Sequence, residues 1–307
     1  MKREQWIGSG MLLFTAVIWG CAVVAQKVAM NDRMGPFTFG AWRFILGALT
    51  LLPFIGAADR RNRRRGERKL TSPGTLLLGG AVCGLFLFTA SSFQQVGLQY
   101  TTVGKSGFIT SMYVVLVPLF GFLIFRHRLS PAMGVGLAIA LVGLYLLCGV
   151  EEGGLNKGDA LTLVSAALYA GHILAIDYFV ARTDGVKLSC LQFFVSAAVY
   201  SAVALWREGL PSLEILNAAR IPLLYTGIMS SGVGFTLQTL GQKRTPPALA
   251  ALIMCMESVF AVLAGVALLH ETLTVWEGIG CLMLFGAMVL VQVPSFLHTK
   301  LKGEESQ

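Results

Sequence analysis

Long apolar stretches recur along the whole chain and are separated by short polar connections. Each stretch approaches or exceeds the roughly 20 residues that an α-helix needs to cross a bilayer. Only 13% of the 307 residues are charged, whereas a soluble domain carries about a quarter. The sequence therefore predicts an all-α polytopic membrane protein with ten transmembrane helices. We expect these helices over residues 8–30, 36–56, 75–97, 102–125, 131–149, 159–181, 188–206, 219–241, 246–269 and 275–293.

The positive charges are distributed unequally between the two sides of this predicted membrane protein. The connections and termini on one side carry 17 Lys and Arg residues, and those on the other side carry 4. Because cytoplasmic loops hold the excess of basic residues, we predict a cell-membrane protein with both termini in the cytoplasm. The densest basic run, residues 60–69, has no aromatic residues for stacking on bases. We interpret it as a contact with anionic lipid headgroups and expect no nucleic-acid partner.

The chain also repeats itself. A shift of 144 residues places Gly97 on Gly241 and Tyr113 on Glu257 without a gap, and near the first helix the shift becomes 150. We predict one unit over residues 1–150 and a second over 151–307, the latter with a short cytoplasmic tail. Each unit contains five predicted helices, an odd number, so the second unit is inverted in the membrane. Inverted repeats are typical of secondary transporters, whose site lies near the midplane at the repeat interface.

Three segments carry a family resemblance. They are Ala16 to Gly20 with the nearby Pro36 and Arg43-Phe44, the run from Tyr100 to Pro118, and the run from Pro246 to Thr274. Together they resemble EamA-type transporters of the drug/metabolite transporter superfamily, over nearly the whole chain. The resemblance implies a ten-helix inverted-repeat transporter with a central cavity lined mainly by the first, third, fourth, sixth, eighth and ninth helices. It also implies small polar metabolites, often amino acids, as cargo.

One ionisable residue stands out among the predicted helices. Glu257 lies near the centre of the ninth, where a carboxyl group is costly and therefore indicates a function. Trp19, Tyr113, Tyr169 and His172 lie at similar depth in the first, fourth and sixth helices. This layer could orient an ammonium group through carboxylate and cation–π contacts, and its acid could carry a proton. The alternative for each residue is structural, as a hydrogen bond between helices or as aromatic packing.

Four further residues have weaker signals. Gln94 and Gln238 lie towards the ends of the third and eighth helices, in symmetric positions, and we predict that they line the mouths of the cavity. Hydrogen bonding between helices is the alternative. Arg43, in the outer third of the second helix, is expected to snorkel outward. Pro118 removes one main-chain hydrogen bond and is expected to loosen the fourth helix beside Tyr113.

The functional prediction is a secondary active transporter of a small polar metabolite such as an amino acid, working by proton coupling or exchange. Export rather than uptake follows from the resemblance alone. An uptake permease, a lipid-headgroup flippase of the same fold and a membrane-embedded enzyme are the alternatives. We expect no enzyme, because HExxH and GxSxG motifs are absent, and no ATP site, because GxxxxGK[ST] is absent. No cofactor or metal is expected, since the six cysteines lie in apolar runs without a CxxC spacing. The sequence leaves open whether the chain forms a homodimer.

Overall fold

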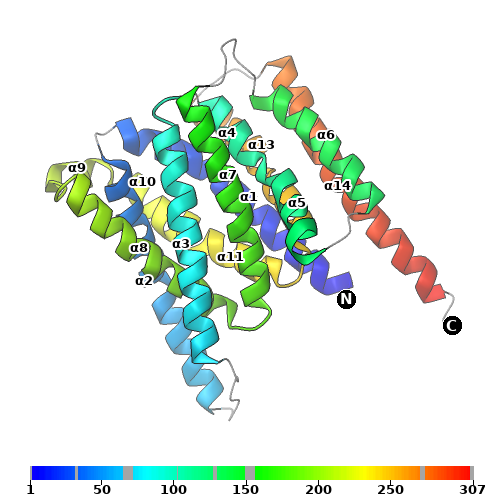
Figure 1. The fold of residues 1–307 in the computed structure, drawn as a ribbon, viewed down its shortest axis with the longest axis horizontal. Helices are drawn as coiled ribbons and strands as arrows, with labels where there is room; N and C mark the ends of the chain where they lie inside the picture. Colours follow the sequence, from blue (N-terminus) through cyan, green and yellow to red (C-terminus); the bar gives the residue numbers. More distant parts are fainter. Residues whose placement is uncertain are drawn as a thin grey trace.

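A computed structural model of the chain describes residues 2–31, 34–64, 72–101, 103–126, 130–148, 156–269 and 274–304. These ranges are almost entirely helical and contain no strand (Figure 1). The helices, with one π-helical segment η1, are α1 Lys2–Asn31, α2 Pro36–Arg64, α3 Pro73–Gly97, α4 Val103–Ser111, α5 Tyr113–Phe125, α6 Pro131–Cys148, α7 Lys157–Val180, α8 Gly185–Arg207, α9 Leu213–Ala218, α10 Arg220–Leu224, η1 Tyr225–Phe235, α11 Thr236–Gln242, α12 Pro247–Met254, α13 Glu257–Leu269 and α14 Val275–Glu304.

The helices account for the ten predicted spans. In the described part of the chain, 7 spans are long and apolar enough to cross a membrane, and the apolar segments Pro131–Leu147 and Val275–Val291 are shorter. The remaining predicted span, 219–241, is divided among α10, η1 and α11. The predicted all-α polytopic class is confirmed. The predicted boundary between the two units, at residues 150 and 151, lies outside the described residues.

The fourth and ninth predicted helices are each interrupted midway. Met112 separates α4 from α5, and Cys255 with Met256 separates α12 from α13. At the first break the Met112 amide donates to the Ile109 carbonyl at 3.1 Å, and at the second the Met256 amide donates to the Ile253 carbonyl at 3.2 Å. These are tight bonds to the third preceding residue. The shift of 144 residues maps one break onto the other, so the interruption belongs to the repeated unit.

Pro118 does not cause this interruption. It lies inside α5, which continues through it to Phe125, and the break comes earlier, at Met112. The equivalent position of the second unit holds Val262, yet α12 and α13 are separated in the same way. The turn lies directly before Tyr113, and the expectation that Pro118 loosens the fourth helix stays a prediction.

The packing of the helices follows the repeat. α1 packs on η1 and α11 as α7 packs on α3, and α2 packs on η1 as α8 packs on α3. α1 also contacts α13 in the way that α7 contacts α5. Two contacts join equivalent helices of the two units, α2 with α8 and α6 with α14, and the latter pair lies side by side at one edge of the bundle (Figure 1). These contacts between the units therefore either have a counterpart or join equivalent helices.

Glycine allows two of these contacts to be unusually close. A Cβ built on Gly8 would lie 2.9 Å from the carbonyl oxygen of Gly241, and one built on Gly158 would lie 2.6 Å from that of Gly97. The shift of 150 maps Gly8 onto Gly158, and the shift of 144 maps Gly97 onto Gly241. Small residues let the backbones of membrane helices approach. The two glycine contacts are thus copies of one interaction.

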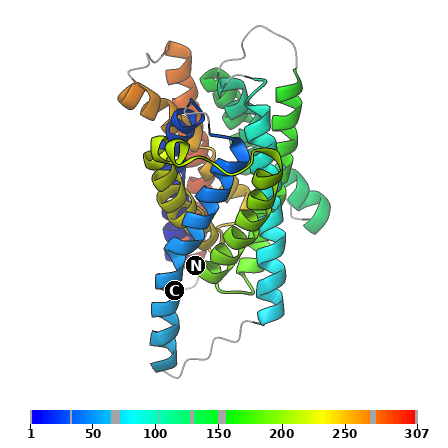
Figure 2. The same cartoon turned by 90° about the vertical axis from the view of Figure 1, so that its left-hand side faces the viewer.

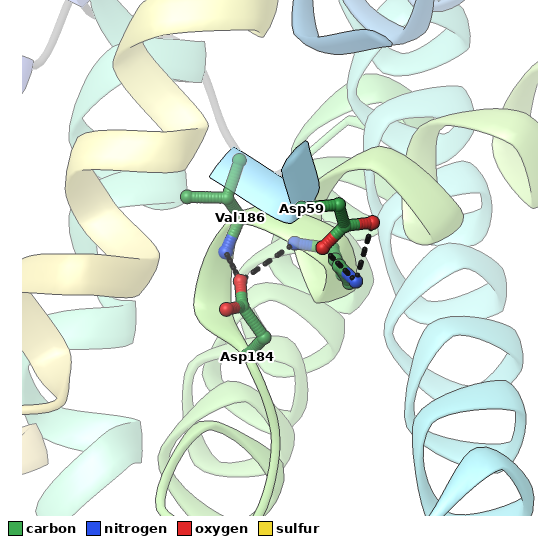
Figure 3. Close-up of polar contacts among 4 residues, drawn as sticks. Asp59, Asp184 and Val186 are labelled. Carbon is green, nitrogen blue, oxygen red and sulfur yellow. Dashed lines mark hydrogen bonds and ion pairs between the residues drawn. The ribbon is translucent and has the colours of Figure 1, made fainter. Parts of the chain in front are cut away.

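An ion pair connects the long second helix with α8. α2 continues to Arg64, past its expected end at residue 56, and its last part projects beyond the bundle (Figure 2). Lys187 Nζ lies 2.7 Å from Asp59 Oδ1 (Figure 3). Asp184 caps α8 by accepting hydrogen bonds from the amides of Val186 and Lys187. The cap holds the first turn of α8 at the point from which Lys187 reaches α2.

Candidate functional site

The two helix breaks bring Tyr113 and Glu257 to the first positions of α5 and α13. The hydroxyls of Ser111 and Ser258 are 3.1 Å apart and link the breaks directly. Glu257 is half-buried and Tyr113 is buried. The Tyr113 hydroxyl interacts electrostatically with the Glu257 carboxyl but has no hydrogen-bond partner among the described residues. Because a helix N-terminus favours negative charge, the position of Glu257 reduces the cost of a carboxylate at this depth.

A polar chain leads from Glu257 to α3. The Tyr169 hydroxyl on α7 interacts electrostatically with the Glu257 carboxyl and donates a hydrogen bond to Gln94 Oε1 at 3.1 Å. Gln94 Nε2 in turn donates to the Thr110 hydroxyl on α4 at 3.2 Å. The structure therefore brings Gln94, Tyr113, Tyr169 and Glu257 into one network formed by α3, α4, α5, α7 and α13.

Trp19 extends from α1 to the π-helical segment. Its Nε1 donates to the Ser230 carbonyl at 3.2 Å, and its ring centroid lies 4.7 Å from that of Phe235 at an interplanar angle of 55°. The side chain is half-buried. Within η1, Ser230 also contacts Arg43, whose Nη2 donates to the Ser230 hydroxyl at 3.1 Å. Trp19 and Arg43 thus share one residue of η1.

Arg43 is buried and does not snorkel outward. Its side chain is only 8% exposed, and its Nε donates to the Ser231 hydroxyl at 2.9 Å. The guanidinium carbon lies 5.4 Å from the Phe44 ring centroid and 5.9 Å from that of Phe235. Sequence reasoning missed this residue as a site candidate. Its signal was a cation inside an apolar span, but its partners are 187 and 188 residues away in the chain.

The described contacts of two other predicted site residues lie outside the network. His172 is buried, and its Nε2 lies 2.9 Å from Gln192 Oε1 on α8. Its ring meets Phe235 edge-on, with 6.1 Å between centroids. Gln238 is buried in α11, and its Oε1 has no hydrogen-bond partner among the described residues. Neither side chain has a described polar contact with Glu257, although both remain within the helices that resemblance assigns to the cavity.

Comparison with known proteins finds similarity along almost the entire chain. The model of the EamA-like transporter family matches residues 6–149 and again residues 156–293. A protein from Archaeoglobus fulgidus named "uncharacterized transporter" is 31% identical over 282 residues, which are 92% of this chain and 84% of that protein. The uncharacterized inner membrane transporter YedA of Escherichia coli strain K12 is 24% identical over 294 residues, 94% of this chain and 91% of its own length.

A solved crystal structure also shares the fold. It superposes with a TM-score of 0.76 and covers 95% of this chain and 97% of its own, at 21% sequence identity. At this low sequence identity, the likeness shows a shared arrangement of helices and nothing further. The two consecutive family matches, each as long as five spans, agree with the paired helix contacts described above.

Proposed function

Because this chain belongs to the EamA-like transporter family, we propose that it is a secondary active transporter that exports a small polar metabolite such as an amino acid. The observation that best supports this proposal is the position of Glu257. An ionisable residue inside a membrane-spanning segment is expensive and marks a substrate or ion pathway. Glu257 begins α13 at a break in the span and lies beside the hydroxyls of Tyr113 and Tyr169.

The chemistry of these groups suits a cargo that carries an amine. A carboxylate accepts charge-assisted hydrogen bonds from an ammonium group, and aromatic faces attract cations. Glu257 supplies the first contact in this proposal, and Trp19 and Tyr169 supply the second. In a proton-coupled cycle Glu257 holds either a proton or the cargo's ammonium group, so that binding of one releases the other.

The helix breaks provide the second element of the proposed mechanism. At each break, bonds to the third preceding residue, such as that from the Ser258 amide to the Cys255 carbonyl, interrupt the regular α-helical pattern. Discontinuous helices of this kind supply backbone groups to cargo and ions in transporters. The count of 17 basic residues on one side against 4 on the other supports cytoplasmic termini. With this orientation and five spans in each unit, we place the second unit inverted in the membrane relative to the first.

The test is metabolite profiling of the medium from cells that overexpress the parent protein, the Glu257→Gln variant or neither. An exporter enriches specific amines or amino acids in the medium only with the parent. Depletion of those compounds from the medium indicates an uptake permease. If soluble metabolites are unchanged while labelled lipids equilibrate across proteoliposome membranes, the protein is a flippase and the proposal is wrong.

A further inference from the structure

Arg43 is a buried cation with no carboxylate partner among the residues that the structure describes. In the described part of the chain, ion pairs join Lys187 with Asp59 and Arg244 with Glu4, and no acidic side chain contacts Arg43. An uncompensated charge in a buried site is strongly destabilising. The sequence nevertheless places an arginine here, beneath the aromatic rings of Phe44 and Phe235. This arrangement requires an explanation beyond packing.

The guanidinium retains most of its hydrogen-bonding capacity. Arginine presents five N–H donors in a rigid planar fork, and the described contacts use one on Nε and one on Nη2. Both acceptors are serine hydroxyls of η1, which are neutral and leave the charge uncompensated. The contacts fix the plane of the guanidinium and leave its remaining N–H groups, including both on Nη1, for another acceptor. The two hydrogen bonds therefore hold the Arg43 guanidinium in a fixed orientation but leave its other N–H donors without a described acceptor.

We infer that Arg43, held by Ser230 and Ser231, is a binding site for a carboxylate group of the transported molecule. The inference rests on the proposed function and adds a second anchoring point to it. The planar fork matches a carboxylate, which accepts two parallel N–H bonds. A single guanidinium balances a single negative charge, whereas a phosphate dianion would leave one charge uncompensated in a buried site.

The surroundings of Arg43 connect this site with Glu257. The Tyr169 hydroxyl interacts electrostatically with both Arg43 and the Glu257 carboxyl, and Ser230 joins Arg43 to Trp19. No ion pair links Arg43 directly with Glu257 in the described residues. Tyr169 thus interacts with both of the opposite charges. A zwitterion that carries both an amine and a carboxylate compensates both charges at once.

Binding can be measured without transport, from the thermal unfolding midpoint of the purified full-length protein in detergent. The probes are the 20 standard amino acids, their methyl esters, acetate, lactate and inorganic phosphate. We expect at least one amino acid to raise the midpoint, and its methyl ester to bind about tenfold more weakly or worse, since the ester loses charge-assisted hydrogen bonds. Equal binding of acid and ester, no binding of any carboxylate, or tighter binding of phosphate overturns the inference.

Variants identify the residue responsible. Arg43→Gln should bring the acid and its ester to within about twofold of each other, while Arg220→Gln, an exposed control, should keep the parent's preference. If Arg43→Gln does not fold, the combined Ser230→Ala and Ser231→Ala variant serves instead, because it keeps the charge but removes the two hydroxyls that hold the guanidinium. In this variant the ratio of affinities for the acid and its methyl ester should fall by about threefold or more. A folded Arg43→Gln protein that retains the preference contradicts the assignment. Release of metabolites by cells tests the proposed function separately, because it does not depend on these binding ratios.

Discussion

Tyr113 and Glu257 occupy the same position in the two halves of the protein. Each is the first residue after the break in its helix, and the hydroxyl of one interacts with the carboxyl of the other. A symmetric pair of acids at this point would repel, because two carboxylates that share a site cannot readily both ionise. Because one of the two equivalent positions holds tyrosine, the site has a single carboxyl group with a neutral hydroxyl beside it.

Replacement of Glu257 tests the importance of that charge. Glu257→Gln keeps the size and hydrogen bonding of the side chain, so folding should survive. We expect transport to fall at least about tenfold, since the cargo's ammonium group loses a charge-assisted partner. The measurement is counterflow of the identified cargo in proteoliposomes across a pH series, with the exposed Glu214→Gln as control. A parent-like rate and pH profile in the Glu257→Gln variant would reduce Glu257 to a structural role.

The two tyrosines of the network should respond differently to loss of their hydroxyls. Tyr169→Phe removes a hydrogen bond to Gln94 and should lower the free energy of unfolding by about 1 kcal/mol. Tyr113→Phe removes a hydroxyl without a hydrogen-bond partner among the described residues. Its stability should change little, and its affinity for cargo should fall. Thermal unfolding and binding measured on the same preparations separate the two effects. A large stability loss in Tyr113→Phe would show that its hydroxyl is bonded within the protein.

The close contact between α1 and α11 should tolerate no side chain at Gly8. A Cβ there would lie 2.5 Å from the Thr245 hydroxyl and 2.9 Å from the Gly241 carbonyl. Gly8→Ala should therefore destabilise the protein by about 1–3 kcal/mol. Gly10→Ala is the matched control, since nothing lies within 4 Å of its Cβ position, and it should be neutral or stabilising. The thermal unfolding midpoint of Gly8→Ala should be lower than that of Gly10→Ala. A higher midpoint for Gly8→Ala would refute the close contact.

Orientation can be tested by chemical labelling. A cysteine at Asn62, in a background without the six natural cysteines, should resist impermeant thiol reagents added to intact cells. A cysteine at Leu210, which is 85% exposed beyond the end of α8, should react readily from outside. Labelling of position 62 and protection of position 210 would reverse the predicted orientation of the whole chain.

The length of the apolar spans and the glycines that recur at the spacing of the repeat made much of this fold predictable. Apolar stretches long enough for a bilayer define membrane helices because the backbone has to bond internally in lipid. Glycines at close helix contacts are repeated because the contact is repeated, as the pairs Gly8 with Gly241 and Gly158 with Gly97 show. The candidate layer was also partly predictable, since Glu257 and Tyr113 are the residues that the repeat superimposes.

The helix breaks and the burial of Arg43 were not predictable from local sequence. The residues at the breaks, Met112, Cys255 and Met256, are ordinary apolar residues without glycine or proline, and nothing in them signals a turn. From the sequence alone, Arg43 is expected to snorkel outward. Its burial depends on Ser230 and Ser231, which the packing of α2 on η1 brings next to it. Both features depend on contacts between distant segments, which a single sequence read along its length does not contain.

The paired glycine contacts have a consequence for the energy balance of the molecule. The beginning of α1 and the beginning of α7, which carry Gly8 and Gly158, lie at opposite ends of the bundle (Figure 1). Both contacts are closed in this conformation. Separation at either end breaks one copy of the same interaction and preserves the other. The two resulting open forms would then differ little in the cost of this contact, and small differences in ligand affinity suffice to select between states of similar energy.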